Sequence, residues 1–118
     1  MTAGGEISTR LKGDVSIIDI RGEVTAVSGQ GIEEAYQGIS ATGAGKILMM
    51  FSAECYINSG GIAVLIGIVS QARKKGQTVR MAGLTPHFQK IFAMVGLARY
   101  AQVHPSEEAA LAAFRDAG

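Results

Sequence analysis

The chain is organised around the stretch CYINSGGIAVL, which occupies residues 55–65. It follows an apolar run, ILMMF at residues 47–51, that is short enough to be a buried strand. It opens a segment whose apolar residues recur at i, i+3, i+4 and i+7, the spacing of one helix face. The residues expected on that face are Ile62, Leu65, Ile66, Val69 and Ala72. The stretch therefore predicts a strand, a tight connection and a helix that packs on a sheet.

The start of this helix is the candidate functional site. Asn58 and Ser59 are both good N-cap residues, because a short side-chain oxygen accepts a bond from a free backbone N–H. Gly60 and Gly61 have no side chain, so another surface can come close to the helix start. A phosphate on Ser59 would meet free N–H donors and the positive end of the helix dipole. Local sequence alone also fits a simple helix cap without chemistry.

Composition is that of one soluble globular domain. The chain has 118 residues, 47% of them hydrophobic and 18% charged, which suits a single folded unit over residues 1–118. A net charge of +1 gives no reason to expect nucleic acid or an anionic membrane as partner. Cys55 is the only cysteine, so an internal disulfide and a cysteine metal cluster are excluded.

Targeting signals are not expected. Residues 1–6 do not combine a basic segment with an apolar one, so we expect no signal peptide. The apolar part of the central helix, residues 62–69, is much shorter than the ~20 residues that span a bilayer. We therefore expect a cytoplasmic protein with no membrane insertion.

Strands and helices alternate after an initial hairpin, which predicts an α/β fold with a mixed sheet of four to five strands and about four helices. The first helix is expected to bury Ile32, Ala35, Tyr36 and Ile39 on one face. The third begins at Thr85-Pro86 and is expected to bury Phe88, Ile91, Phe92 and Val95. Expected strands are residues 7–12, 15–20, 46–52, 78–82 and 101–103, and expected helices are residues 27–40, 59–75, 85–95 and 106–114.

Motifs spread over nearly the whole chain resemble those of one family. They are GEV at residues 22–24, NSGGI at 58–62, LTP at 84–86 and IFAMVGL at 91–97. In this order they resemble the STAS domain family, of the anti-sigma factor antagonist type. The family's phosphorylation loop usually reads Asp-Ser, then Ser or Thr, then Gly and an aliphatic residue. This chain departs from it at Asn58 and at Gly60, which replaces the second hydroxyl residue.

The resemblance implies a single STAS-like domain, with one sheet and helices packed mainly on one side, that is a regulatory switch and not an enzyme. It implies reversible phosphorylation of Ser59, with no cofactor. The implied partners are an anti-sigma factor serine kinase and a metal-dependent serine phosphatase. The implied partner-binding residues are Asn58, Ser59, Gly60, Gly61, Ile62 and Val64. The two departures favour an alternative, a constitutive STAS scaffold or transporter-accessory subunit without phosphoregulation.

Enzyme and metal sites have little support in the sequence. A nucleophile elbow needs Gly-x-Ser-x-Gly, and Ile57 occupies the first glycine position before Ser59. His87 and His104 are expected on the surface, and neither has a His or Cys at metal-ligand spacing. Val64 and Ile68 widen the apolar face of the central helix, so either the fold covers them or they form an exposed patch beside Ser59.

Overall fold

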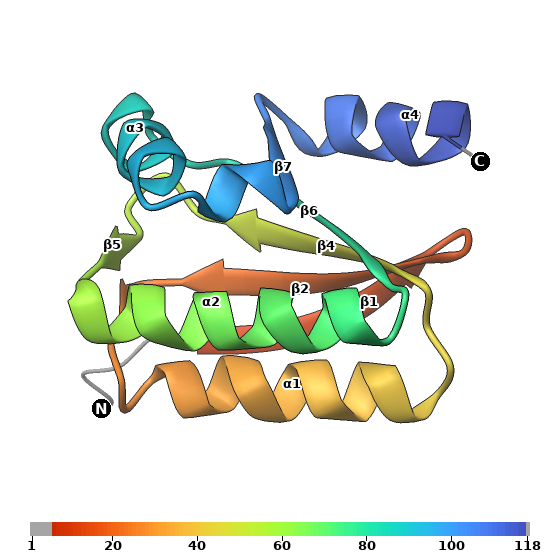
Figure 1. Cartoon of the computed structure of the whole chain (residues 1–118), viewed down its shortest axis with the longest axis horizontal. Coiled ribbons are helices and arrows are strands. Elements are labelled where there is room, and N and C mark those ends of the chain that lie inside the picture. The colour runs from red at the N-terminus through yellow and green to blue at the C-terminus, as the bar shows by residue number, and fades with distance from the viewer. Residues whose placement is uncertain (1–5, 118) are drawn as a thin grey trace.

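The apolar run of the sequence forms the strand β4 (Lys46–Phe51), which lies in the middle of the sheet. Its neighbours β2 (Val15–Arg21) and β6 (Thr78–Ala82) both run parallel to it. β1 (Glu6–Lys12) pairs antiparallel with β2, and β7 (Ala101–His104) pairs parallel with β6. The result is a mixed five-stranded sheet in the order β1-β2-β4-β6-β7, as predicted (Figure 1). Central parallel strands are buried on both faces, which explains why β4 reads as a continuous apolar run.

The structure is a computed structural model that describes residues 6–117. Residues 1–5, where the sequence predicts no signal peptide, lie outside the described residues, as does residue 118. No helix within the described range is both long and apolar enough to cross a membrane.

Helices cover both faces of the sheet, but three of the four helices in the described part of the chain lie on one side. α1 (Gly29–Ala41) and α2 (Ser59–Lys74) run side by side in the lower part of Figure 1, where α2 passes in front of β1. α3 (Pro86–Met94), followed by the 3-10 turn η1 (Leu97–Arg99), joins the same large core. α4 (Glu107–Ala117) packs on the opposite face. The expectation of helices mainly on one side is therefore confirmed.

Side-chain alternation along β4 supplies both cores. Ile47, Met49 and Phe51 face the large core under α1 and α2, whereas Leu48 faces the smaller core that includes Phe114 of α4. Successive side chains of a strand point to opposite faces, so one apolar strand can serve two layers. β4 therefore offers an apolar surface to the helices on both faces of the sheet without a change in its direction.

The sequence did not reveal two short strands. β3 (Glu23–Val24) and β5 (Tyr56–Ile57) pair in parallel as a separate two-stranded sheet. Two residues are too few to show an alternating pattern, so only the tertiary contact identifies them. The first helix also starts two residues later than the predicted 27, at Gly29, because residues 25–28 form a hydrogen-bonded turn. In that turn, the N–H of Ser28 donates to Thr25 Oγ1.

The buried face of α2 differs from the predicted one. Ile66 is exposed, whereas Ile68 is fully buried. The reason is that α2 packs on α1 as well as on the sheet, since Val64 lies against Gly29 and Gln71 hydrogen-bonds to Glu33 of α1. The buried arc is therefore rotated toward α1. Of the two alternatives for Val64 and Ile68, coverage by the fold is the correct one. The fold covers Ile68 completely and Val64 partly.

The predicted buried face of the third helix needs one correction. Phe88 and Phe92 are buried as expected, and the ring of Phe92 packs edge-on against Phe51 of β4. Val95 is exposed instead. It occupies the C-cap of α3, directly before Gly96, whose φ of 83° turns the chain out of the helix. A side chain at this point no longer follows the helical repeat.

An arginine on the edge strand ties α4 to the sheet. Arg10 Nε of β1 lies 2.7 Å from Asp19 Oδ2 of β2, and Arg10 Nη1 lies 3.1 Å from Glu107 Oε2 in the first turn of α4. The hydrogen bond from Arg10 holds the pKa of Glu107 below its usual value of 4.5. Neutralising Glu107 therefore removes a contact between α4 and the hairpin.

We predict that Glu107→Gln lowers the free energy of unfolding by about 0.5–1 kcal/mol at pH 7, a value limited by solvent screening of the partly exposed pair. A carboxylate whose pKa is depressed by folding stabilises the protein above its unfolded pKa and loses this effect as the pH falls. The difference between Glu107→Gln and wild type should therefore shrink from pH 6 to pH 3. Urea unfolding across that range measures it, with Glu108→Gln as the control. An equal effect of both substitutions would contradict the role of Arg10.

Candidate functional site

The short β3–β5 ladder positions the start of α2. The N–H of Tyr56 donates to the carbonyl of Gly22 at 3.3 Å, and the N–H of Asn58 donates to the carbonyl of Val24 at 3.1 Å. The GEV motif and the NSGGI motif, more than thirty residues apart in the sequence, are thus direct neighbours. Backbone pairing of this kind holds the helix start in one position relative to the sheet.

Of the two N-cap candidates, Asn58 is the N-cap of α2. Its backbone is extended, and its Oδ1 accepts a hydrogen bond from the N–H of Gly61 at 2.9 Å. Its carbonyl accepts from the N–H of Ile62, also at 2.9 Å. The N–H groups of Ser59 and Gly60 have no such acceptor within the described residues and point out of the helix start. They are the free donors that an anion at this position would meet.

Ser59 occupies the first helical position and is exposed. Within residues 6–117 its hydroxyl makes no side-chain hydrogen bond, because the capping role belongs to Asn58. Ser59 is therefore not the helix cap, which removes the simplest structural explanation for a serine at this position. Its hydroxyl is free to react or to meet a partner.

The two glycines accommodate the chain's own backbone. A Cβ at Gly61 would lie 2.2 Å from the carbonyl oxygen of Val24, closer than any real contact. A Cβ at Gly60 would lie 3.1 Å from the Cβ of Ala26 in the loop between β3 and α1. The two glycines thus make room for β3 and for the loop after it in the same chain, rather than only for an external partner. Gly61 is buried, so it supports the site from within.

The other predicted residues surround Ser59 to different degrees. Asn58 is exposed like Ser59, whereas Gly60, Ile62 and Val64 are partly buried. Sequence reasoning missed Val27 and Tyr56, which are 77% and 59% exposed and lie on the segments that flank the helix start. Val27 could have been recognised as an exposed apolar residue in a turn, but the sequence pattern placed it inside the predicted first helix, residues 27–40.

The two histidines, His87 and His104, are far from Ser59 in the sequence and differ from each other in their exposure. His87 is exposed, as predicted, and packs edge-on against Phe88. His104 is half-buried at the end of β7, with its Nε2 3.1 Å from Arg80 Nη1, so the expected surface position is wrong. Burial and the charge of Arg80 lower the pKa of His104 and so favour its neutral form. In residues 6–117 no cluster of three or more His, Cys, Asp or Glu side chains could hold a metal ion.

The domain family follows from the sequence and agrees with this geometry. The family model for the STAS domain matches residues 6–110. The chain belongs to the STAS domain family. The matched range includes the GEV motif, the Ser59 loop and α3. A search of curated proteins finds no match for this STAS domain.

Solved structures with the same fold include several anti-sigma factor antagonists. One from Mycobacterium paratuberculosis superposes with a TM-score of 0.84 at 19% identity, over 98% of both chains. A putative one from Thermotoga maritima gives 0.81 at 14% identity, over 92% of this chain and 94% of that one. The Bacillus cell fate determinant SpoIIAA in its phosphorylated form gives 0.67 at 17% identity, over 93% and 100%. At these identities the likeness shows the fold alone.

We predict that Gly61→Ala destabilises this STAS domain by about 1–3 kcal/mol, the usual cost of forcing an extra methyl group into a packed site. The reason is the clash with the Val24 carbonyl oxygen. The matched control is Gly67→Ala in the exposed middle of the same helix, where a Cβ meets nothing within 4 Å. That substitution should stabilise by up to about 1 kcal/mol through helix propensity. Urea unfolding of both variants tests this, and shifts in the same direction would contradict it.

Proposed function

We propose that this protein is a non-enzymatic, protein-binding switch of the anti-sigma factor antagonist type, controlled by reversible phosphorylation of Ser59. One observation carries the proposal. The hydroxyl of Ser59 is exposed and unbonded among the described residues, at the first position of a helix whose leading N–H groups are free. Membership of the STAS family and the fold shared with anti-sigma factor antagonists support it.

The helix start would tolerate a phosphate without refolding. A phosphoserine adds about −1.5 to −2 charges and three acceptor oxygens. The N–H groups of Ser59 and Gly60 and the helix dipole favour that charge. Asn58 is neutral and already bonded to Gly61, so it neither repels the phosphate nor loses its own role. Phosphorylation would thus change the surface and leave the fold as it is.

The effect would be exerted on a partner. Unmodified Ser59 would dock together with Asn58 and the exposed side chains of Val27 and Tyr56. Burying a phosphate against a desolvated surface costs several kcal/mol unless that surface supplies cations. The proposed partners are a serine kinase that is also an anti-sigma factor, and a metal-dependent serine phosphatase that removes the phosphate. The proposed compartment is the cytoplasm, where such partners act.

We predict that the cognate kinase, incubated with the protein and ATP, phosphorylates Ser59 and no other serine. The position of Ser59 at a free helix start is the reason. Intact mass and site mapping by mass spectrometry provide the measurement, with Ser59→Ala as the unreactive control. A phosphate mapped to another residue, or none with any serine kinase encoded beside an anti-sigma system in the same genome, would overturn the proposal.

Substitutions should separate the switch from the fold. Ser59→Asp should keep the fold, since an acid at a helix N-terminus gains about 0.3–1 kcal/mol, yet weaken kinase binding at least tenfold. The matched control is Ser106→Asp, which places the same charge at the start of α4, where Ser106 Oγ caps the N–H of Ala109. Ser59→Ala should bind almost normally. Calorimetric titration measures affinity, with circular dichroism as the folding control. If Ser59→Asp binds like wild type, a constitutive scaffold or transporter-accessory subunit becomes the better interpretation.

The neutral cap yields a further prediction. Asn58→Asp keeps the acceptor for the N–H of Gly61 and should stabilise the unmodified protein by about 0.3–1 kcal/mol. In the Ser59-phosphorylated protein, the new carboxylate repels the phosphate, so the same substitution should stabilise less or destabilise. Thermal unfolding of both forms measures the difference, and Asn58→Ser serves as the neutral control cap. Equal shifts in the two forms would show that the charge pair has no effect.

A further inference from the structure

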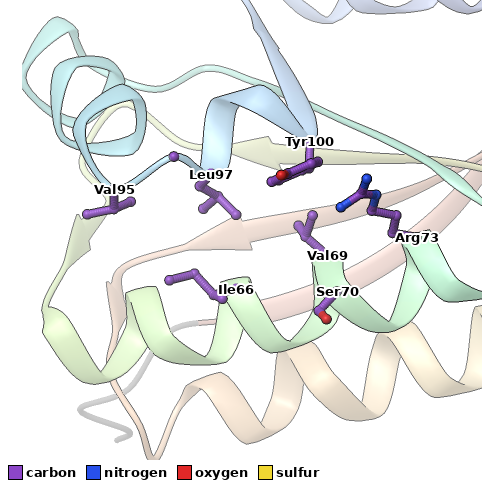
Figure 2. A pocket seen from close by; sticks show the side chains of 8 residues that line it. Ile66, Val69, Ser70, Arg73, Val95, Leu97 and Tyr100 are labelled. Carbon is purple, nitrogen blue, oxygen red and sulfur yellow. The ribbon is translucent and has the colours of Figure 1, made fainter.

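A groove lies between α2 and the segment from the end of α3 to η1, outside the candidate site described above. Its volume is about 220 Å³. Figure 2 shows Ile66, Val69 and Arg73 pointing from α2 toward Val95, Leu97 and Tyr100 on the other side. Val69 and Leu97 are buried and form its floor. The groove is therefore built from residues that the core already holds in place.

The walls of the groove are apolar but uncovered. Ile66, Val95 and Tyr100 are 43%, 48% and 49% exposed, although each is a large apolar or aromatic residue. They stand on separate elements, and the left-handed backbone of Gly96, with φ of 83°, sets the turn that brings Val95 and Leu97 to face α2. A concave cluster of exposed apolar side chains around a buried floor is typical of a protein-binding site.

One end of the groove is positively charged. The guanidinium of Arg73 lies over the ring of Tyr100, 4.2 Å from its centroid, which orients the cation at the rim. Ser70 adds a hydroxyl, and the lining residues within the described chain include no acid. Arg99 directly precedes Tyr100 in the sequence and carries the same sign as Arg73. An occupant that matches this end must carry a negative charge.

The groove is continuous with the Ser59 site along α2. With 3.6 residues per turn, Ser59, Ile66, Ser70 and Arg73 lie within an arc of about 60° on the helix surface. At 1.5 Å per residue, Ile66 lies about 10 Å and Arg73 about 21 Å along the axis from Ser59. A single helix or strand of a partner, laid along α2, can therefore contact Ser59 at one end and the groove at the other.

We infer that this groove is a docking site for an acidic amphipathic segment of a partner protein, which inserts one large apolar side chain and pairs a carboxylate with Arg73. The inference rests on the proposed function, because it assigns the groove to the same partner that contacts Ser59. The volume of about 220 Å³ suits one aromatic or long aliphatic side chain and is small for a drug-sized ligand. Phosphorylation at Ser59 then acts on one end of an interface whose other end supplies affinity.

The first experiment uses defined peptides and needs no kinase. The probe is an Ala/Gln-rich helical peptide of about twelve residues with one Phe and, four positions later, one Glu. In one matched peptide Ala replaces the Phe, and in another Gln replaces the Glu. Titration into the isotope-labelled full chain should shift the amide NMR signals of Ile66, Ser70 and Tyr100, and both matched peptides should bind at least about fivefold more weakly.

Variants of the protein test the same contacts. Ile66→Gln should weaken peptide binding about five- to tenfold, and it should keep the fold because Ile66 is exposed. Arg73→Gln should abolish the preference for the Glu peptide, whereas the matched control Lys74→Gln should retain it. Ser59→Ala should bind the peptides like wild type. With the kinase, Ile66→Gln should raise KM for phosphorylation of Ser59 and leave kcat unchanged.

The outcomes separate the two proposals. The docking inference is overturned if the peptide shifts only amide NMR signals outside the groove, or shifts none at millimolar concentration. A phosphate mapped to Ser59 would still leave the proposed switch intact in that case. Groove binding without phosphorylation of Ser59 by any kinase supports the docking site and overturns the switch. Concentration-dependent shifts of the groove signals without peptide would identify a second copy of this chain as the occupant and overturn the acidic segment.

Discussion

The backbone of β3 passes so close to the first turn of α2 that only a glycine fits between them. The Val24 carbonyl oxygen accepts a hydrogen bond from the N–H of Asn58, and it lies only 2.2 Å from where a Cβ at position 61 would be. This contact sets the start of α2, and α2 in turn supplies Leu65, Ile68 and Ala72 to the large core. Much of the layer beneath the sheet therefore depends on one backbone approach that a single methyl group would block.

The same constraint explains where the candidate site lies. The chain leaves β4, forms β5 and enters α2, so Ser59 lies beyond the carboxyl end of a central parallel strand. In open α/β sheets this edge is the usual place for ligand contacts, because helix starts with free N–H groups gather there. Here Asn58 satisfies part of the helix start and leaves the donors around Ser59 open. Under the proposed function, a charge added at Ser59 would change the surface and leave this scaffold as it is.

The two sides of α2 serve different purposes. The side toward α1 carries an amide and carboxylate network in which Gln71 bonds to both Glu33 and Gln37. The opposite side carries Ile66 and Arg73, which face η1 across an open groove. A helix that packs against a sheet and one helical neighbour buries about half its circumference, and the remaining apolar residues stay accessible. Exposure of Ile66 is thus a consequence of where α1 packs.

The sequence by itself determined the α/β class, the hairpin, the central strand and the helix start at residues 58–59, because local periodicity and capping chemistry act over a few residues. Tertiary structure decided the rest. The pairing of β3 with β5, the partner of Gly61 and the burial of Ile68 instead of Ile66 depend on segments far apart in the chain. A local sequence pattern does not show which neighbouring elements a helix will pack against, because that depends on the packing of the whole layer.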